Sequence, residues 1–236
     1  MLKNLFPHKI LSLGDKFFAF LIIILVLVII TGLFYSLIVS PPDYIQGDSV
    51  RIMYVHVPTS LLALTCFAFI GIASAINIIF KIKILPLMAK SLAPVGLLFC
   101  FISIVTGSLW GKPTWGTWWV WDARLTSMLI LLLFYIAYII TWKLIENYEK
   151  AKRISSLIAI IGSLNLPIIK YSVDWWNTLH QPSSITLTSA PKIHYSMLIP
   201  LTIMIIGITI YALLIFLMKY KTEIIKFKLD KKKKEN

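Results

Sequence analysis

Residues 17–39 read FFAFLIIILVLVIITGLFYSLIV, a run without a single charged side chain. The hydrocarbon core of a bilayer is roughly 30 Å thick, so a helix that crosses it needs about 20 mostly apolar residues. The run is too long for the core of a signal peptide and contains no small-residue cleavage site. It therefore predicts a retained membrane-spanning helix.

The rest of the chain repeats this pattern. Of the 236 residues, 58% are hydrophobic and 14% are charged, and the mean hydropathy is +0.85; soluble chains are nearer half apolar and a quarter charged. We expect one integral membrane domain over residues 1–236, an all-α polytopic fold with six transmembrane helices and no separate soluble domain. The other five expected spans are residues 57–80, 87–109, 125–142, 154–169 and 195–218. Pro167 should kink or end the fifth.

The basic residues predict the orientation of these spans. Lys and Arg accumulate on the cytoplasmic side of membrane proteins. If the N-terminus lies inside, 18 of the 23 basic residues fall on inner segments and five on outer ones. Both termini are therefore expected on the cytoplasmic or matrix side. The outer segments would be residues 40–56, 110–124 and 170–194.

The net charge of +13 does not indicate a nucleic-acid partner. Eight of the basic residues are lysines in a tail at residues 219–236, and such a tail is typical of a solvated or lipid-headgroup-facing segment. Cys66 and Cys100 lie in apolar runs and are expected to be small buried hydrophobes. We expect the lipid bilayer, and no nucleic acid, as a partner.

The interiors of the apolar runs contain no Asp, Glu, Lys, Arg or His. Ion-coupled transporters need such groups within the bilayer as proton relays or counter-charges, so this class is disfavoured. The sequence also shows no nucleophile–base arrangement, phosphate-binding loop or carboxylate pair. We therefore do not expect an enzyme.

The second outer segment, residues 110–124, reads WGKPTWGTWWVWDAR and contains five of the eight tryptophans. An interfacial aromatic belt would spread tryptophans over all helix ends. If the segment is helical, one face carries Trp115, Trp118, Trp119 and Asp122. A dense aromatic shelf with cations beside it suits a large planar ligand with acidic groups.

Two outer segments carry histidines. His56 lies immediately before the second expected span, and both His180 and His194 lie in the third outer segment, whereas His8 lies on the inner side. Neutral imidazole is a good ligand for iron, including haem iron. Spacing alone does not choose between His180 and His194 as the partner of His56.

Three motifs carry a family resemblance. Residues 110–127, WGKPTWGTWWVWDARLTS, resemble the tryptophan-rich WWD signature of haem-handling membrane proteins. Within that family, RIMYVHVP at 51–58 and NLPIIKYSVDWWNTLHQ at 165–181 are similar to the histidine motifs of the cytochrome c maturation protein C group, also called haem exporter protein C. The larger relatives with this signature have many more spans than six.

The resemblance implies a function. Such a protein handles haem b at the outer face and presents it to a membrane-anchored haem chaperone for c-type cytochrome biogenesis. It would work beside the ATP-binding and membrane subunits of an ABC transporter and a small single-span helper protein. The implied location is the bacterial inner membrane, multi-pass, or alternatively the mitochondrial inner membrane.

The resemblance also implies roles for single residues. His56 and His180 become the axial ligands of the haem iron, while His194 matches no histidine of the family. Arg51 and Arg124 become the propionate partners. The haem platform would consist of Trp115, Trp118, Trp119, Trp121 and Asp122.

Two other functions are compatible with parts of the pattern. A membrane electron carrier with a bis-histidine b-type haem usually places its histidines inside facing helices, and no histidine here lies inside an apolar run. A purely structural transporter subunit could use the tryptophans as a docking surface. We rank both below haem delivery.

Overall fold

The computed structural model describes residues 11–176, 178–180 and 193–235. Apart from one isolated bridge between Asp43 and Gly47, the regular structure of these residues is helical. Six helices are long and apolar enough to cross a membrane. This confirms the predicted all-α polytopic fold.

Several of the six spans contain two helical pieces. Their bounds are α2 (Asp15–Phe34) with the π-helical η1 (Tyr35–Val39), the 3-10 helix η2 (Asp48–Ile52) with α3 (Met53–Phe80), α4 (Ile84–Trp115), α5 (Ala123–Leu144), α6 (Tyr148–Ser163) with α7 (Asn165–Trp175), and α8 (Tyr195–Glu235).

Three helices extend beyond the apolar runs. α4 continues to Trp115, the α6–α7 span covers residues 148–175, and α8 reaches Glu235. Hydropathy marks where a helix leaves the hydrocarbon, whereas capping residues mark where it ends. The expected interruption near Pro167 is present: α6 ends at Ser163, and Pro167 lies in the first turn of α7, where its missing N–H is not needed.

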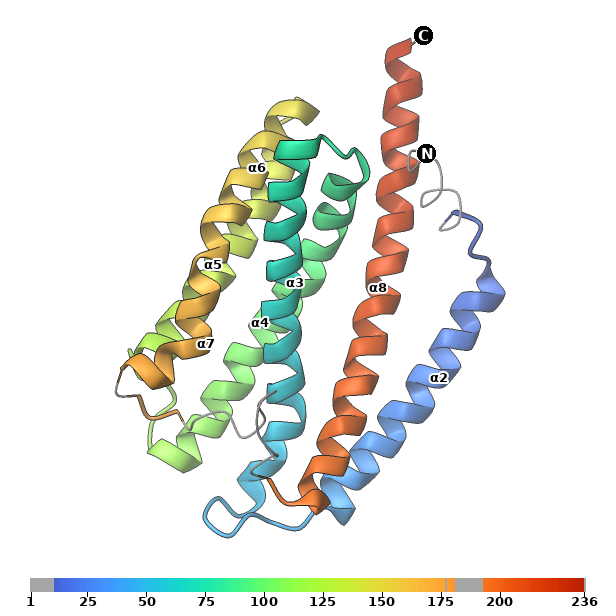
Figure 1. The fold of residues 1–236 in the computed structure, drawn as a ribbon. Coiled ribbons are helices and arrows are strands. Elements are labelled where there is room, and N and C mark those ends of the chain that lie inside the picture. The colour runs from blue at the N-terminus through green and yellow to red at the C-terminus, as the bar shows by residue number, and fades with distance from the viewer. Residues whose placement is uncertain (1–10, 177, 181–192, 236) are drawn as a thin grey trace.

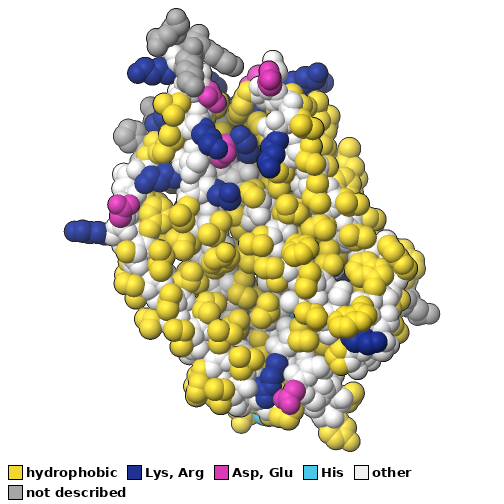
Figure 2. Space-filling model, turned by 180° about the vertical axis from the view of Figure 1, so that it is seen from behind, with side chains coloured by type: hydrophobic (Ala, Val, Ile, Leu, Met, Phe, Trp, Pro, Cys, Tyr) yellow, Lys and Arg dark blue, Asp and Glu magenta, His cyan; other side chains and the backbone are white. Residues whose placement is uncertain are grey.

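The helices pack in a bundle around α3 and α4 (Figure 1). α5, α6 and α7 lie on one side of this pair and α8 lies on the other, while α2 packs mainly on α8. α2 exposes large side chains such as Ile23, Leu27 and Ile30, each about 60% accessible. Figure 2 shows hydrophobic side chains over the middle of one face, with most charged side chains toward one end, as a surface in contact with lipid requires.

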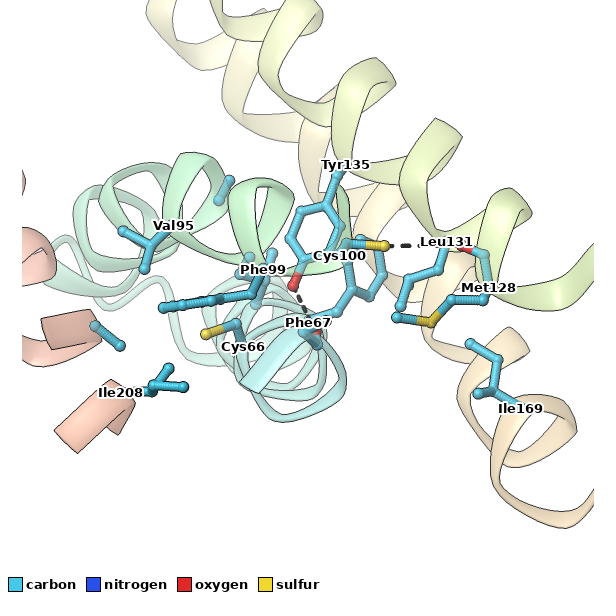
Figure 3. Close-up of a cluster of buried hydrophobic side chains, with 14 of the residues drawn as sticks. Cys66, Phe67, Val95, Phe99, Cys100, Met128, Leu131, Tyr135, Ile169 and Ile208 are labelled. Carbon is cyan, nitrogen blue, oxygen red and sulfur yellow. Dashed lines mark hydrogen bonds between the residues drawn. The ribbon is translucent and has the colours of Figure 1, made fainter. Parts of the chain in front are cut away.

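The core of the bundle lies where α3, α4 and α5 meet (Figure 3). The hydroxyl of the fully buried Tyr135 donates a hydrogen bond of 2.7 Å to the carbonyl of Ala63. Cys66 and Cys100 are buried in the same cluster, which confirms their expected role as small hydrophobes.

The basic tail is more ordered than the sequence suggests. Through residue 235 it continues α8 as a helix, and Tyr220 and Ile224 are buried against Leu87. Lys90 forms a 2.7 Å ion pair with Glu223. One apolar face of its first turns therefore packs on the start of α4, while Lys219, Lys226 and Lys228 are exposed. The expectation of a solvated or lipid-headgroup-facing tail stays a prediction.

Candidate functional site

The tryptophan segment is only partly helical. α4 runs through Trp115 and ends at Gly116, whose positive φ of 76° is readily adopted by glycine. Residues 117–122 are irregular, and α5 begins after Asp122, whose Oδ1 accepts a hydrogen bond of 2.8 Å from the Leu125 N–H. The single helical face considered for this segment is therefore wrong: a C-terminal glycine and an N-cap aspartate divide it.

This division separates the tryptophans into two groups. Trp115 and Trp119 are half-buried, whereas Trp118 is 53% and Trp121 is 75% accessible. The rings of Trp119 and Trp121 meet edge to face at 5.6 Å between centroids. The segment thus presents both a sheltered and an open aromatic surface.

His56 lies in the first turn of α3 and faces α4. Its Nδ1 is 3.0 Å from the carbonyl oxygen of Ser103 and 3.1 Å from Oγ1 of Thr106. The edge of its ring meets Trp110, with centroids 5.8 Å apart. The ring is therefore fixed by two residues of α4 and by the first tryptophan of the segment.

The contact with the Ser103 carbonyl also determines the tautomer of His56. A carbonyl oxygen only accepts, so Nδ1 must carry the proton and donate it. Nε2 is then the nitrogen with the free lone pair. Histidines that bind metals are oriented in this way, by a hydrogen bond from the nitrogen that does not bind.

His180 lies beyond the end of α7, outside any helix, yet its side chain is only 21% accessible. Its ring packs on Trp115 with centroids 4.8 Å apart, and its Nδ1 is 3.9 Å from Oδ2 of Asp122. Burial, followed by the nearby charges of Arg124 and His56, lowers the pKa of His180 to about 3. The imidazole is therefore neutral at physiological pH, the form that binds iron.

In the tryptophan segment and at His180, three polar atoms are buried without a hydrogen-bond partner in the described chain: Nε1 of Trp119, Oδ2 of Asp122 and Nδ1 of His180. More than nine in ten buried polar groups in native proteins have a partner. Two of the three atoms, Oδ2 of Asp122 and Nδ1 of His180, are 3.9 Å apart, as expected of a site that is completed by a ligand or by water.

The two candidate propionate partners differ in their surroundings. The charge of Arg124 lies near both His56 and His180, and it faces Asp122 and Asp174. Arg51 instead forms a 2.9 Å ion pair with Asp48 and donates to the Ser36 carbonyl at 2.8 Å. Within the described residues these polar partners of Arg51 lie outside the tryptophan segment, so its role stays a prediction.

The competing histidine, His194, has other neighbours. Its Nδ1 is 2.8 Å from the Ser196 hydroxyl, and its ring packs on Tyr195 at the start of α8. Its described contacts stay within that turn, whereas those of His180 reach Trp115 and Asp122. The geometry supports the choice of His180, which remains a prediction.

Sequence reasoning missed three residues of this site. Ser103 and Thr106 orient His56, and Gln46 accepts a 2.8 Å hydrogen bond from Nε1 of Trp110. Two hydroxyl residues three positions apart in an apolar run indicate a polar helix face, so Ser103 and Thr106 could have been found. Nothing in the sequence pairs Gln46 with Trp110.

The donor set suits a metal held in a macrocycle rather than a bare ion. Among the described residues, no group of three or more His, Cys, Asp or Glu side chains is arranged to hold a metal ion. Two neutral histidines beside aromatic rings and an arginine match what haem needs: two axial ligands, apolar faces and a partner for carboxylates.

Comparison with known proteins agrees with this geometry. The family model described as heme exporter protein C matches residues 2–235. Proteins named heme exporter protein C from Bradyrhizobium diazoefficiens and Haemophilus influenzae are 39% and 41% identical; each match covers 93% of this chain, and 83% and 88% of the relative. A ccmC-like mitochondrial protein of cytochrome c biosynthesis from Marchantia polymorpha is 39% identical over 85% of both chains. This chain therefore belongs to the heme exporter protein C family.

Proposed function

We propose that this chain binds haem b at the outer membrane face and presents it to a membrane-anchored haem chaperone during assembly of c-type cytochromes. Relatives are named for heme export and cytochrome c biosynthesis. The observation that carries the proposal is convergence: His56 and His180, 124 positions apart in the chain, both contact the tryptophan segment, with the charge of Arg124 near both rings.

The described residues can be assigned roles toward the haem. His56 and His180 would bind the iron, the half-buried Trp115 and Trp119 would cover the macrocycle, and Arg124 would pair with a propionate. The exposed Trp118 and Trp121 would leave an open edge that the chaperone can approach. An electron carrier usually places both histidines within helices, and His180 lies outside them.

Delivery is a matter of binding and release rather than of bond chemistry. We assign the chain no catalytic residue: it positions haem for a reaction that belongs to the acceptor. The ATP-binding and membrane subunits of an ABC transporter and a small single-span protein are the proposed partners. The proposed location is the bacterial inner membrane, with the mitochondrial inner membrane as the alternative.

Haem transfer between purified components tests this function. The protein in nanodiscs should bind haem in a one-to-one ratio with a six-coordinate absorption spectrum. On addition of the apo-chaperone, the spectrum should change to that of the haem-loaded acceptor, and haem should elute with it. A protein that binds no haem, or that never yields it to the acceptor, would contradict the proposal.

The proposed orientation can be tested by labelling. Tyr44, fully exposed between η1 and η2, should lie outside, and Glu149, 74% accessible at the start of α6, should lie inside. A membrane-impermeant maleimide should label Tyr44→Cys in intact cells or spheroplasts, and Glu149→Cys only after permeabilisation. The wild type is the control, because Cys66 and Cys100 are buried. The opposite labelling pattern would reverse the topology.

A further inference from the structure

We propose that the two iron ligands have unequal roles, His56 being retained and His180 being released, with Asp122 as the positioning residue that controls the release. This inference rests on the proposed function, because it concerns the same haem. It states the order in which the two histidines leave the iron during transfer: His180 leaves first, so the side of the haem that faces His180 becomes free for the acceptor first.

His56 is built into the rigid part of the bundle. It lies on α3, the helix with the most extensive packing on α4, and its Nδ1 already has both a carbonyl and a hydroxyl partner on α4. Its Nε2 therefore carries a free lone pair, and its ring is already held in one orientation, before any ligand arrives. Because the His56 side chain is already ordered, its binding to the haem iron costs little conformational entropy.

Among the described residues, His180 has fewer restraints than His56. It lies outside the helices, and its described contacts are the Trp115 ring, the carboxylate of Asp122, and a 3.2 Å hydrogen bond from its backbone N–H to Thr178 Oγ1. Its Nδ1 is buried without a hydrogen-bond partner in the described chain. The Trp115 contact thus positions the His180 ring without a hydrogen bond to Nδ1 in the described chain, and the Fe–N bond that His180 would form is the weaker of the two.

Asp122 is placed to set the strength of that bond. Its Oδ1 caps α5 through Leu125, whereas its Oδ2 is buried, unpaired and 3.9 Å from Nδ1 of His180. A shift of about 1 Å would create a charge-assisted N–H···O hydrogen bond. That bond would fix Nδ1 as the protonated nitrogen and make Nε2 a stronger donor to iron.

The release itself is a ligand exchange. The Fe–Nε2 bond to His180 breaks with both electrons remaining on the imidazole, and the incoming donor forms a new bond with its own electron pair. No proton or electron is transferred, and the iron keeps its oxidation state. The Nδ1–H group of His180 either keeps its hydrogen bond to Asp122 or moves back to the 3.9 Å distance between Nδ1 and Oδ2 seen in this structure.

Carbon monoxide binding to the reduced haem protein tests this order, because CO can bind only after one histidine leaves. His180→Ala should keep at least about half of the haem and bind CO without a preceding slow step, whereas His56→Ala should keep less than about one tenth. The C–O stretching frequency of the wild-type adduct should match that of His180→Ala.

Asp122→Asn, which still caps α5, should speed CO binding about tenfold, the factor of one charge-assisted hydrogen bond.

Asp174→Asn is the matched control, since it removes the other carboxylate that faces Arg124 and should leave the CO rate unchanged. His180→Gly and His56→Gly with added imidazole separate lost ligation from misfolding, because imidazole should restore the six-coordinate spectrum of His180→Gly more readily than that of His56→Gly. Equal haem loss from both alanine variants, or a wild-type adduct that matches His56→Ala, would overturn the order. An Asp122→Asn rate equal to wild type would overturn the positioning role of Asp122. Absence of haem from the wild type would instead contradict the proposed function.

Discussion

A double variant, His56→Ala with His180→Ala, is expected to lose its bound haem almost completely. Each imidazole is positioned by contacts of its own, His56 by Ser103 and Thr106 and His180 by Trp115. Without both, the iron keeps no protein ligand from these two sites, and only aromatic contacts and Arg124 remain. We expect the affinity for haem to fall at least about 100-fold, which corresponds to about 2.8 kcal/mol.

The haem content of purified protein, measured by absorption and by pyridine haemochrome, checks this expectation. His194→Ala is the matched control, because its described contacts stay with Tyr195 and Ser196; its haem content and spectrum should equal those of the wild type. If the double variant kept its haem while the His194 variant lost it, the assignment of His180 would be wrong and His194 would take its place.

The fold could be predicted from the sequence because membrane helices obey one strong constraint. A charge-free run such as residues 17–39 has no other stable arrangement in lipid, since every backbone polar group must be bonded within the helix. Helix ends obey weaker and more local constraints. The end of α4 depends on the backbone of Gly116, and the start of α5 depends on the carboxylate of Asp122. A hydropathy pattern predicts neither of these helix ends.

The candidate site could be predicted in part for a similar reason. Histidines and tryptophans are rare and chemically distinctive, so His56, His180 and residues 110–124 stand out from an apolar background. The residues that hold these side chains in place do not stand out in the sequence. The hydrogen bond between Gln46 and Trp110 joins residues 64 positions apart, and the link from His56 to Ser103 spans 47. Such pairs depend on how the helices pack, which one sequence does not encode in any local pattern.

Gly96→Ala should be among the most destabilising single-methyl substitutions in the bundle. A Cβ at this position of α4 would overlap the hydroxyl oxygen of Tyr135 and would lie 2.5 Å from its Cζ. Tyr135 cannot move aside, because it is fully buried, its hydroxyl is bonded to Ala63, and its ring meets Phe67 edge to face at 4.8 Å. Alanine favours a helix over glycine by about 1 kcal/mol, but overpacking costs up to about 3 kcal/mol or more.

The net loss should be about 2 kcal/mol, which corresponds to a decrease in Tm of about 5 °C for a chain of this size. Thermal unfolding in detergent or nanodiscs measures it, with Gly14→Ala as the control because a Cβ there meets nothing within 4 Å. Tyr135→Leu combined with Gly96→Ala should recover part of the loss, since the ring that causes the clash is gone. Tyr135→Phe should recover less, because the ring carbon 2.5 Å away remains. If Gly96→Ala were as stable as Gly14→Ala, the close approach of α4 and α5 at Gly96 and Tyr135 would be wrong.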